Sequence, residues 1–120
     1  MTPWVVDWVR AFAITVAIEA LVATPLLVRT EPHLGRRLAA VVLVNLSTHP
    51  LVWFLFPGLA VRFGIRVGLS EAWAVLGEIG GYVIVWPGIG LPRAAITSVL
   101  ANGASFAAGL LLPLATRGGA

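Results

Sequence analysis

Two pairs of polar residues recur at matching places within apolar stretches of this chain. Asn45 follows Glu19 by 26 residues, and Asn102 follows Glu78 by 24. Each asparagine is followed, three positions later, by a hydroxyl-bearing residue. Carboxyl and carboxamide groups are costly inside apolar segments and often mark proton, ion or substrate sites there. The recurrence predicts a duplicated helical hairpin that builds one polar site.

Helical spacing adds further polar side chains to the same faces, because residues three or four positions apart lie on one side of a helix. The supporting polar residues selected in this way are Thr48, Tyr82 and Ser105. The same rule places His49 beside Asn45, where an imidazole could act as a ligand or a proton relay. The hydroxyl groups could also bond only to their own helices, and Tyr82 could be a packing residue.

The chemistry available to this set is proton or cation binding. Two carboxyl groups at one depth can share a proton, bind a cation or pair with an imidazole. The predicted binding residues are Glu19, Asn45, His49, Glu78 and Asn102. The asparagines would orient the ligand or the carboxyl groups, or would only join helices by hydrogen bonds. Whether a metal ion binds is left open, because no spacing motif specifies one.

The elements that must position these residues are membrane-spanning helices. Hydrophobic residues make up 59% of the 120-residue chain and charged residues 11%, whereas a soluble domain has about 25% charged residues. Segments of roughly 20 apolar residues cross a bilayer as helices. The predicted spans are 4–28, 38–60, 71–91 and 94–114. The predicted fold is therefore an all-α integral membrane four-helix bundle, a single transmembrane domain with hairpin repeats 1–61 and 62–120.

Placing the polar residues in one layer requires the third helix to end near Trp86, before Pro87. The segment Arg62–Ser70 is expected to be a connection, because it contains three residues of turn or breaker type. Ser70 would then cap the third helix, and Glu71 would lie at the membrane interface.

Backbone features in the middle helices also have predicted consequences. Pro50 has no N–H group, so the carbonyl of Leu46 loses its usual partner and a kink is expected. Gly77 and Gly81 are small residues on one face and should allow a neighbouring helix to approach closely.

Several other classes of protein are disfavoured by what the sequence contains. With no cysteine and a net charge of only +3, neither thiolate chemistry nor nucleic-acid binding is indicated. No phosphate-binding loop or nucleophile elbow is present, so an enzyme is the less favoured interpretation and no cofactor is expected.

The start of the chain holds Asp7 and no early basic residue, which favours a retained helix over a signal peptide. Four arginines fall on each side of the predicted bundle, so the positive-inside rule selects no orientation.

Three segments carry a resemblance to a class of small four-helix prokaryotic membrane proteins. They are VNLSTHPLVW, LGEIGGYVIVW and SVLANGASFAAGL. The class pattern falls on Asn45, Thr48 and Pro50, on Glu78, and on Asn102, Ser105 and Gly109. His49 stands where asparagine is more usual. The resemblance implies the architecture and the polar layer only, and no activity. The expected location is the inner membrane of a prokaryote. The chain length and the glutamate in the first helix, Glu19, also resemble small multidrug exporters. The second acid and the two asparagines in later helices depart from that pattern.

The predicted function is transport or conduction of a small solute, proton or cation through the polar layer. Its partners would be the lipid bilayer and that solute or ion. Four helices enclose little volume, so a homo-oligomer or a larger membrane complex is expected. The alternative is a non-catalytic membrane subunit or scaffold whose buried polar residues specify helix packing.

Overall fold

Four α-helices make up nearly all of the described chain. The structure is a computed structural model that describes residues 2–118, with side chains for residues 2–112. The helices are α1 (Pro3–Leu26), α2 (Leu34–Pro50), α3 (Phe63–Val85) and α4 (Leu91–Gly118). A widened π turn (Leu51–Leu55) and a 3-10 turn (Phe56–Gly58) prolong α2. Residues 2–118 contain no strand, in agreement with the all-α prediction.

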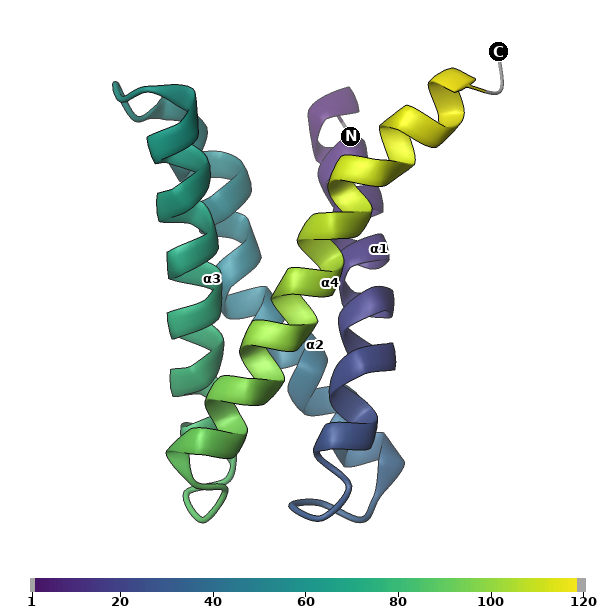
Figure 1. The fold of residues 1–120 in the computed structure, drawn as a ribbon, viewed down its shortest axis with the longest axis vertical. Helices are drawn as coiled ribbons and strands as arrows, with labels where there is room; N and C mark the ends of the chain where they lie inside the picture. The colour runs from purple at the N-terminus through teal and green to yellow at the C-terminus, as the bar shows by residue number, and fades with distance from the viewer. Residues whose placement is uncertain (1, 119–120) are drawn as a thin grey trace.

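The helices form a closed ring in which each packs against its two neighbours in the chain, with α4 returning to α1. In Figure 1, α1 and α3 stand upright, and α2 and α4 cross between them in opposite directions. The end that carries the N-terminus and the α2–α3 connection (59–62) is called here the terminal end. The opposite end, with the connections 27–33 and 86–90, is called the hairpin end.

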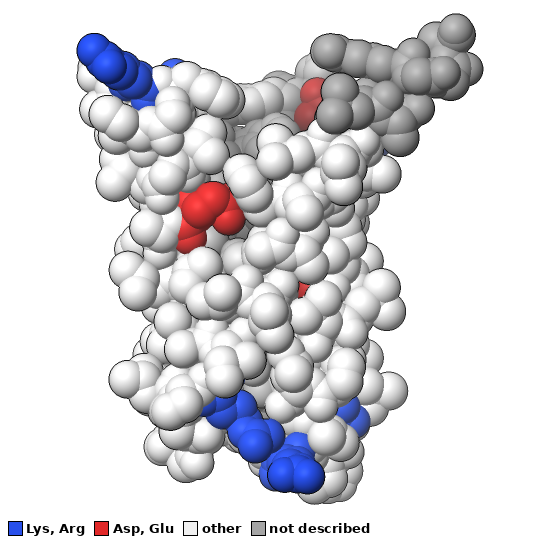
Figure 2. All heavy atoms as spheres, in the orientation of Figure 1, with Lys and Arg blue, Asp and Glu red and all other residues white. Residues whose placement is uncertain are grey.

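Two of the helical segments, Leu34–Gly58 and Leu91–Leu112, are long and apolar enough to cross a membrane. Figure 2 shows one face of the molecule, with positively charged atoms near its two ends and a largely uncharged band between them. Such a charge distribution suits a bilayer, because arginine side chains are stable in the interfacial layers and costly in the apolar layer.

The predicted connection at Arg62–Ser70 is wrong, because α3 already begins at Phe63. Ser70 therefore lies inside the helix and does not cap it. A glycine in a helix interior costs only about 1 kcal/mol relative to alanine, so Gly64 and Gly68 do not interrupt α3. At its other end α3 stops at Val85, as the common polar layer requires.

The predicted start of the fourth span also differs from the helix. The α4 helix begins at Leu91, so Pro92 and Arg93 lie in its first turn and not in a separate connection. Proline fits there because the first N–H groups of a helix have no intrahelical acceptor.

The predicted distortion at Pro50 appears as the π turn that follows it. The carbonyl of Thr48, two residues before the proline, accepts a hydrogen bond from Trp73 Nε1 at 3.3 Å. A side chain from α3 thus supplies a donor where the α2 backbone pattern is altered.

The contact between α2 and α3 depends on Gly77 and Gly81. A Cβ atom at Gly77 would lie 2.6 Å from Thr48 Cγ2, and one at Gly81 would lie 2.6 Å from Val44 Cγ1. Neither distance is compatible with a normal carbon contact. The two glycines therefore set how closely the hairpins approach each other.

We expect Gly81→Ala to lower the free energy of unfolding by about 1–3 kcal/mol, because the new methyl group overpacks against Val44. Gly80→Ala is the matched control, because a Cβ atom there meets nothing within 4 Å. Helix propensity alone should make that control neutral or stabilising by up to about 1 kcal/mol. Thermal unfolding in detergent measures both, and adding Val44→Ala should relieve the Gly81→Ala defect. Equal losses at positions 80 and 81 would contradict the close-contact argument.

Two arginines stabilise the C-terminal end of α1 at the hairpin end. Arg37 Nη1 donates to the carbonyl of Thr24 at 2.6 Å, and Arg93 Nη1 donates to that of Leu26 at 3.3 Å. The last carbonyls of a helix lack intrahelical donors, and positive charge is favourable beside them. These contacts join the starts of α2 and α4 to the end of α1.

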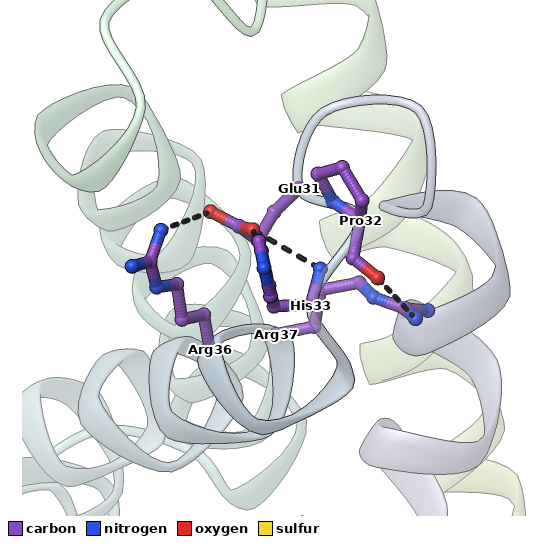
Figure 3. A network of polar contacts seen from close by, with 5 residues as sticks. All are labelled: Glu31, Pro32, His33, Arg36 and Arg37. Atoms are coloured by element: carbon purple, nitrogen blue, oxygen red, sulfur yellow. Dashed lines mark hydrogen bonds and ion pairs between the residues drawn. The ribbon is translucent and has the colours of Figure 1, made fainter.

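The α1–α2 connection is organised around Glu31 (Figure 3). Its Oε1 accepts from the backbone N–H of His33 at 3.1 Å and lies 2.9 Å from His33 Nδ1. Arg36 Nη1 lies 3.8 Å from Oε2. The hydrogen bonds from His33, and then the charge of Arg36, hold the pKa of the Glu31 carboxyl below its ordinary value.

The lowered pKa predicts how stability depends on pH. An ionised Glu31 stabilises the folded state above the unfolded pKa, and this contribution is lost as pH falls through the lower folded pKa. The Tm advantage of the wild type over Glu31→Gln should therefore be full near pH 7 and shrink at acid pH. Thermal unfolding of both proteins from about pH 7 to about pH 3 measures it. An advantage that is constant over this range would show that the ionised form contributes nothing.

Candidate functional site

The first hairpin brings Glu19 and Asn45 together as the sequence predicts. Asn45 Nδ2 donates to Glu19 Oε2 at 2.8 Å and to the carbonyl of Val41, one turn earlier in α2, at 2.9 Å. Both side chains are 1% exposed. The amide is therefore held by its own helix and directed at the carboxyl group of the preceding one.

The second hairpin contains the same arrangement. Asn102 Nδ2 donates to Glu78 Oε2 at 2.5 Å and to the carbonyl of Ser98, again one turn earlier, at 2.9 Å. Ser98 Oγ in turn donates to the carbonyl of Val75 at 2.8 Å, which ties α4 to α3. The two amides have equivalent partners in the two hairpins.

The two polar pairs meet within the bundle. Ser105 Oγ donates to Glu19 Oε1 at 2.9 Å, a contact between α4 and α1. Glu19 and Glu78 line the same cavity, so their carboxyl groups lie near each other. Because α1 and α3 lie on opposite sides of the ring, their approach to one cavity places the carboxyl pair at the middle of the bundle.

One oxygen of the pair has no donor. Glu78 Oε1 is fully buried and accepts no hydrogen bond from any described residue, whereas both oxygens of Glu19 accept one. A hydrogen bond between two carboxyl groups requires a proton on one of them, since an ionised carboxylate can only accept. One shared proton, or one bound cation, would satisfy the remaining oxygen.

A cavity of about 510 Å³ leads from the terminal end of the bundle to this pair. Its polar lining consists of Thr15, Glu19, Asn45, Thr48, His49, Glu71, Glu78, Asn102 and Ser105. Its apolar lining includes Val52, Phe63, Val67, Phe106 and Leu110. Figure 2 shows acidic atoms beside a hollow on the face formed by α3 and α4.

Packed apolar side chains occupy the bundle between the carboxyl pair and the hairpin end. Its buried apolar residues are Ala23, Leu27, Val41, Val44, Tyr82, Ile89, Ala94 and Ala101. None of them lines the cavity. In this conformation the carboxyl pair is therefore reached from the terminal end, and packed apolar side chains separate it from the hairpin end.

His49 lines the cavity but has its hydrogen bond elsewhere. Its Nδ1 accepts from Trp8 Nε1 at 3.0 Å, and its ring stacks on Trp53. Since Nδ1 accepts, the proton of a neutral ring is on Nε2. The imidazole is thus oriented by the aromatic residues of α1 and the end of α2, and its role as a relay stays a prediction.

Two of the supporting residues form no hydrogen bond with the carboxyl pair, which is the alternative that the sequence left open for them. Thr48 Oγ1 donates only within its own helix, to the carbonyls of Val44 and Asn45 at 3.3 and 3.4 Å. Tyr82 is fully buried below the pair and stacks on Trp86, and its hydroxyl has no partner among the described residues. Ser105, unlike Thr48, joins the site directly.

Glu71 is a site residue that the sequence interpretation placed at the interface. It is half-buried and lines the cavity between its terminal end and the carboxyl pair. The available signal was its spacing from Glu78, because residues seven apart share one face of a helix. The early start of α3 moves Glu71 from the helix end to its interior.

The described part of the chain contains no preformed cluster of metal ligands. No three His, Asp or Glu side chains there are placed to hold one ion. The carboxyl pair offers acceptors for a proton or for a weakly held cation.

Comparison of the chain with protein-family models, with curated proteins and with solved structures finds no match.

Proposed function

We propose that this protein is an integral membrane carrier that moves a proton or a small cation by way of the Glu19–Glu78 pair. All four helices would span the inner membrane of a prokaryote. The two long apolar helical segments and the arginines at the ends of the bundle support this placement. Polar contacts in the middle of such a bundle fit the general rule that intramembrane carboxyl groups face protein or water-filled space.

The two hairpins are proposed to be parallel repeats related by an axis along the membrane normal. The support is the equivalence of their hydrogen bonds, since each asparagine donates both to the glutamate of the preceding helix and to a carbonyl one turn back. The site would then lie where the repeats meet.

The observation that carries the functional proposal is the cavity that ends on the carboxyl pair. An ion entering from the terminal end would pass Glu71 and reach Glu78 Oε1, the oxygen with no donor. It would take the place of the proton between the two carboxyl groups. Proton and cation would thereby compete for one site, which is the basis of exchange.

The packed apolar side chains between the carboxyl pair and the hairpin end favour a carrier over an open channel. Release at the hairpin end would require the apolar side chains around Tyr82 and Val44 to separate. Such a change between two packed arrangements is the usual basis of alternating access. A homo-oligomer or a larger complex would supply the surface against which the hairpins move.

The second candidate is a scaffold whose polar residues only specify helix packing. It is favoured by the number of donors used within the bundle, since both asparagine amides and Ser105 are engaged. The scaffold interpretation assigns no role to the cavity, whereas the carrier interpretation does.

Flux measurements in liposomes test the proposal. The purified protein should move protons in exchange for monovalent cations, at a rate that saturates with cation concentration. Empty liposomes and liposomes with heat-unfolded protein give the background. No flux above background for protons or any monovalent cation would favour the scaffold.

A further inference from the structure

We propose that the ligand of this cavity is a primary ammonium ion with a small apolar body. The proposal rests on the proposed function and names its substrate class. Three properties of the described cavity lining support it, namely its free acceptors, its charge and its apolar wall.

The floor of the cavity offers hydrogen-bond acceptors and few free donors. Both asparagine Nδ2 groups are already engaged with carboxyl groups and helix carbonyls. No described residue donates to Asn45 Oδ1, Asn102 Oδ1 or Glu78 Oε1. An ammonium group has three N–H donors and no acceptor. It therefore matches the floor, whereas a carboxylate or phosphate would meet acceptors only.

The charge of the lining also selects a cation. Three glutamates line the cavity, and none of the arginines that the structure describes does. Arg66 belongs to an adjoining cavity of about 380 Å³, and its Nη1 donates to the carbonyl of Pro57 at 2.7 Å. Positive charge is thus held outside the cavity proper. Glu71 lies between that region and Glu78, where it can attract an entering cation.

The wall argues for an organic ligand over a bare inorganic ion. Phe63, Phe106 and Leu110 face the same space as the carboxyl pair. The volume of about 510 Å³ falls within the range of roughly 300–1,000 Å³ that is usual for small-molecule sites. An inorganic ion would leave this apolar surface against water, while an aryl or alkyl group would cover it.

Binding of phenethylammonium to the purified protein in detergent, measured by calorimetry, tests the inference. The matched probes are 2-phenylethanol, which has no charge, phenyltrimethylammonium, which has no N–H donor, and methylammonium, which has no apolar body. We expect saturable binding of phenethylammonium and affinities for the three other probes that are weaker by on the order of 10-fold or more.

Variants locate the site. Glu78→Gln should weaken phenethylammonium binding by on the order of 10- to 100-fold. Glu71→Gln, at a position without a hydrogen-bond partner among the described residues, should weaken it several-fold and leave the fold intact. Asp7→Asn is the matched control, because Asp7 is exposed and does not line the cavity, and its affinity should equal that of the wild type.

The outcomes separate this inference from the proposed function. Proton–cation flux without saturable phenethylammonium binding would overturn the ligand class alone. Equal affinity for 2-phenylethanol, or an equal loss in Asp7→Asn, would also overturn it. Binding that depends on Glu78 in a protein without any flux would support the ligand class and overturn the carrier proposal.

Discussion

Replacing Glu19 and Glu78 together with glutamine is expected to abolish proton–cation exchange in liposomes. Glutamine has nearly the shape of glutamate but cannot hold an exchangeable proton or a negative charge. If the pair is where proton and cation compete, the double variant has no site for either. Loss of exchange to the level of empty liposomes is therefore the predicted result, with normal thermal unfolding in detergent.

The single variants should differ in size of effect. Glu78→Gln should be the more damaging, because Glu78 Oε1 is the oxygen left for the ligand, whereas both oxygens of Glu19 already accept hydrogen bonds. Asp7→Asn removes one carboxyl group outside the cavity and should exchange at the wild-type rate. Exchange that survives in the double variant would remove the carboxyl pair from any transport role.

The second large effect is expected on stability, from Asn102→Leu. Removing the amide leaves Glu78 without a hydrogen-bond donor at either oxygen, in a place where the side chain is 1% exposed. Leaving a buried polar group unpaired costs about 1–3 kcal/mol, and more if it is charged. An interhelical hydrogen bond in a membrane protein contributes only about 0.6 kcal/mol on average. The unpaired carboxyl group thus dominates, and we expect a loss of about 2–3 kcal/mol.

The matched variant Asn45→Leu should lower the free energy of unfolding by less than Asn102→Leu does. It also removes a donor, but Glu19 keeps the hydrogen bond from Ser105 Oγ. Adding Glu78→Leu to Asn102→Leu should recover part of the stability, because no unpaired carboxyl group then remains. Reversible unfolding in mixed detergents, measured for the wild type and these three variants, tests the prediction. Equal losses for the two asparagine variants, or no recovery in the double variant, would contradict the argument.

Much of the helix content and of the polar layer is predictable from the sequence. Long apolar segments must be helical if the backbone is to be satisfied in lipid. The pairing of Glu19 with Asn45, and of Glu78 with Asn102, follows from equal depth on adjacent antiparallel helices. The end of α3 before Trp86 is likewise set locally, by the Pro87-Gly88 dipeptide.

The errors have local causes too. Gly64 and Gly68 suggested a connection, yet a glycine in a helix is a modest cost that neighbouring apolar residues and tertiary packing can outweigh. Treating the segment as a loop moved Glu71 to the interface and removed it from the site. The α4 start was missed because proline is unfavourable within a helix but suitable in its first turn.

The sequence by itself determined that the chain forms apolar helices and which polar groups share a face of each one, because those properties depend on composition and on the 3.6-residue period. Only the tertiary structure decided which faces meet. Thr48 and Ser105 occupy equivalent places in the sequence, yet Thr48 packs against Gly77 while Ser105 reaches Glu19. The reason is packing, since helix crossing and the contact at the α3 glycines determine which side chains approach across the ring. The meeting of the two carboxyl groups, and the cavity that opens to one end only, arise from that packing.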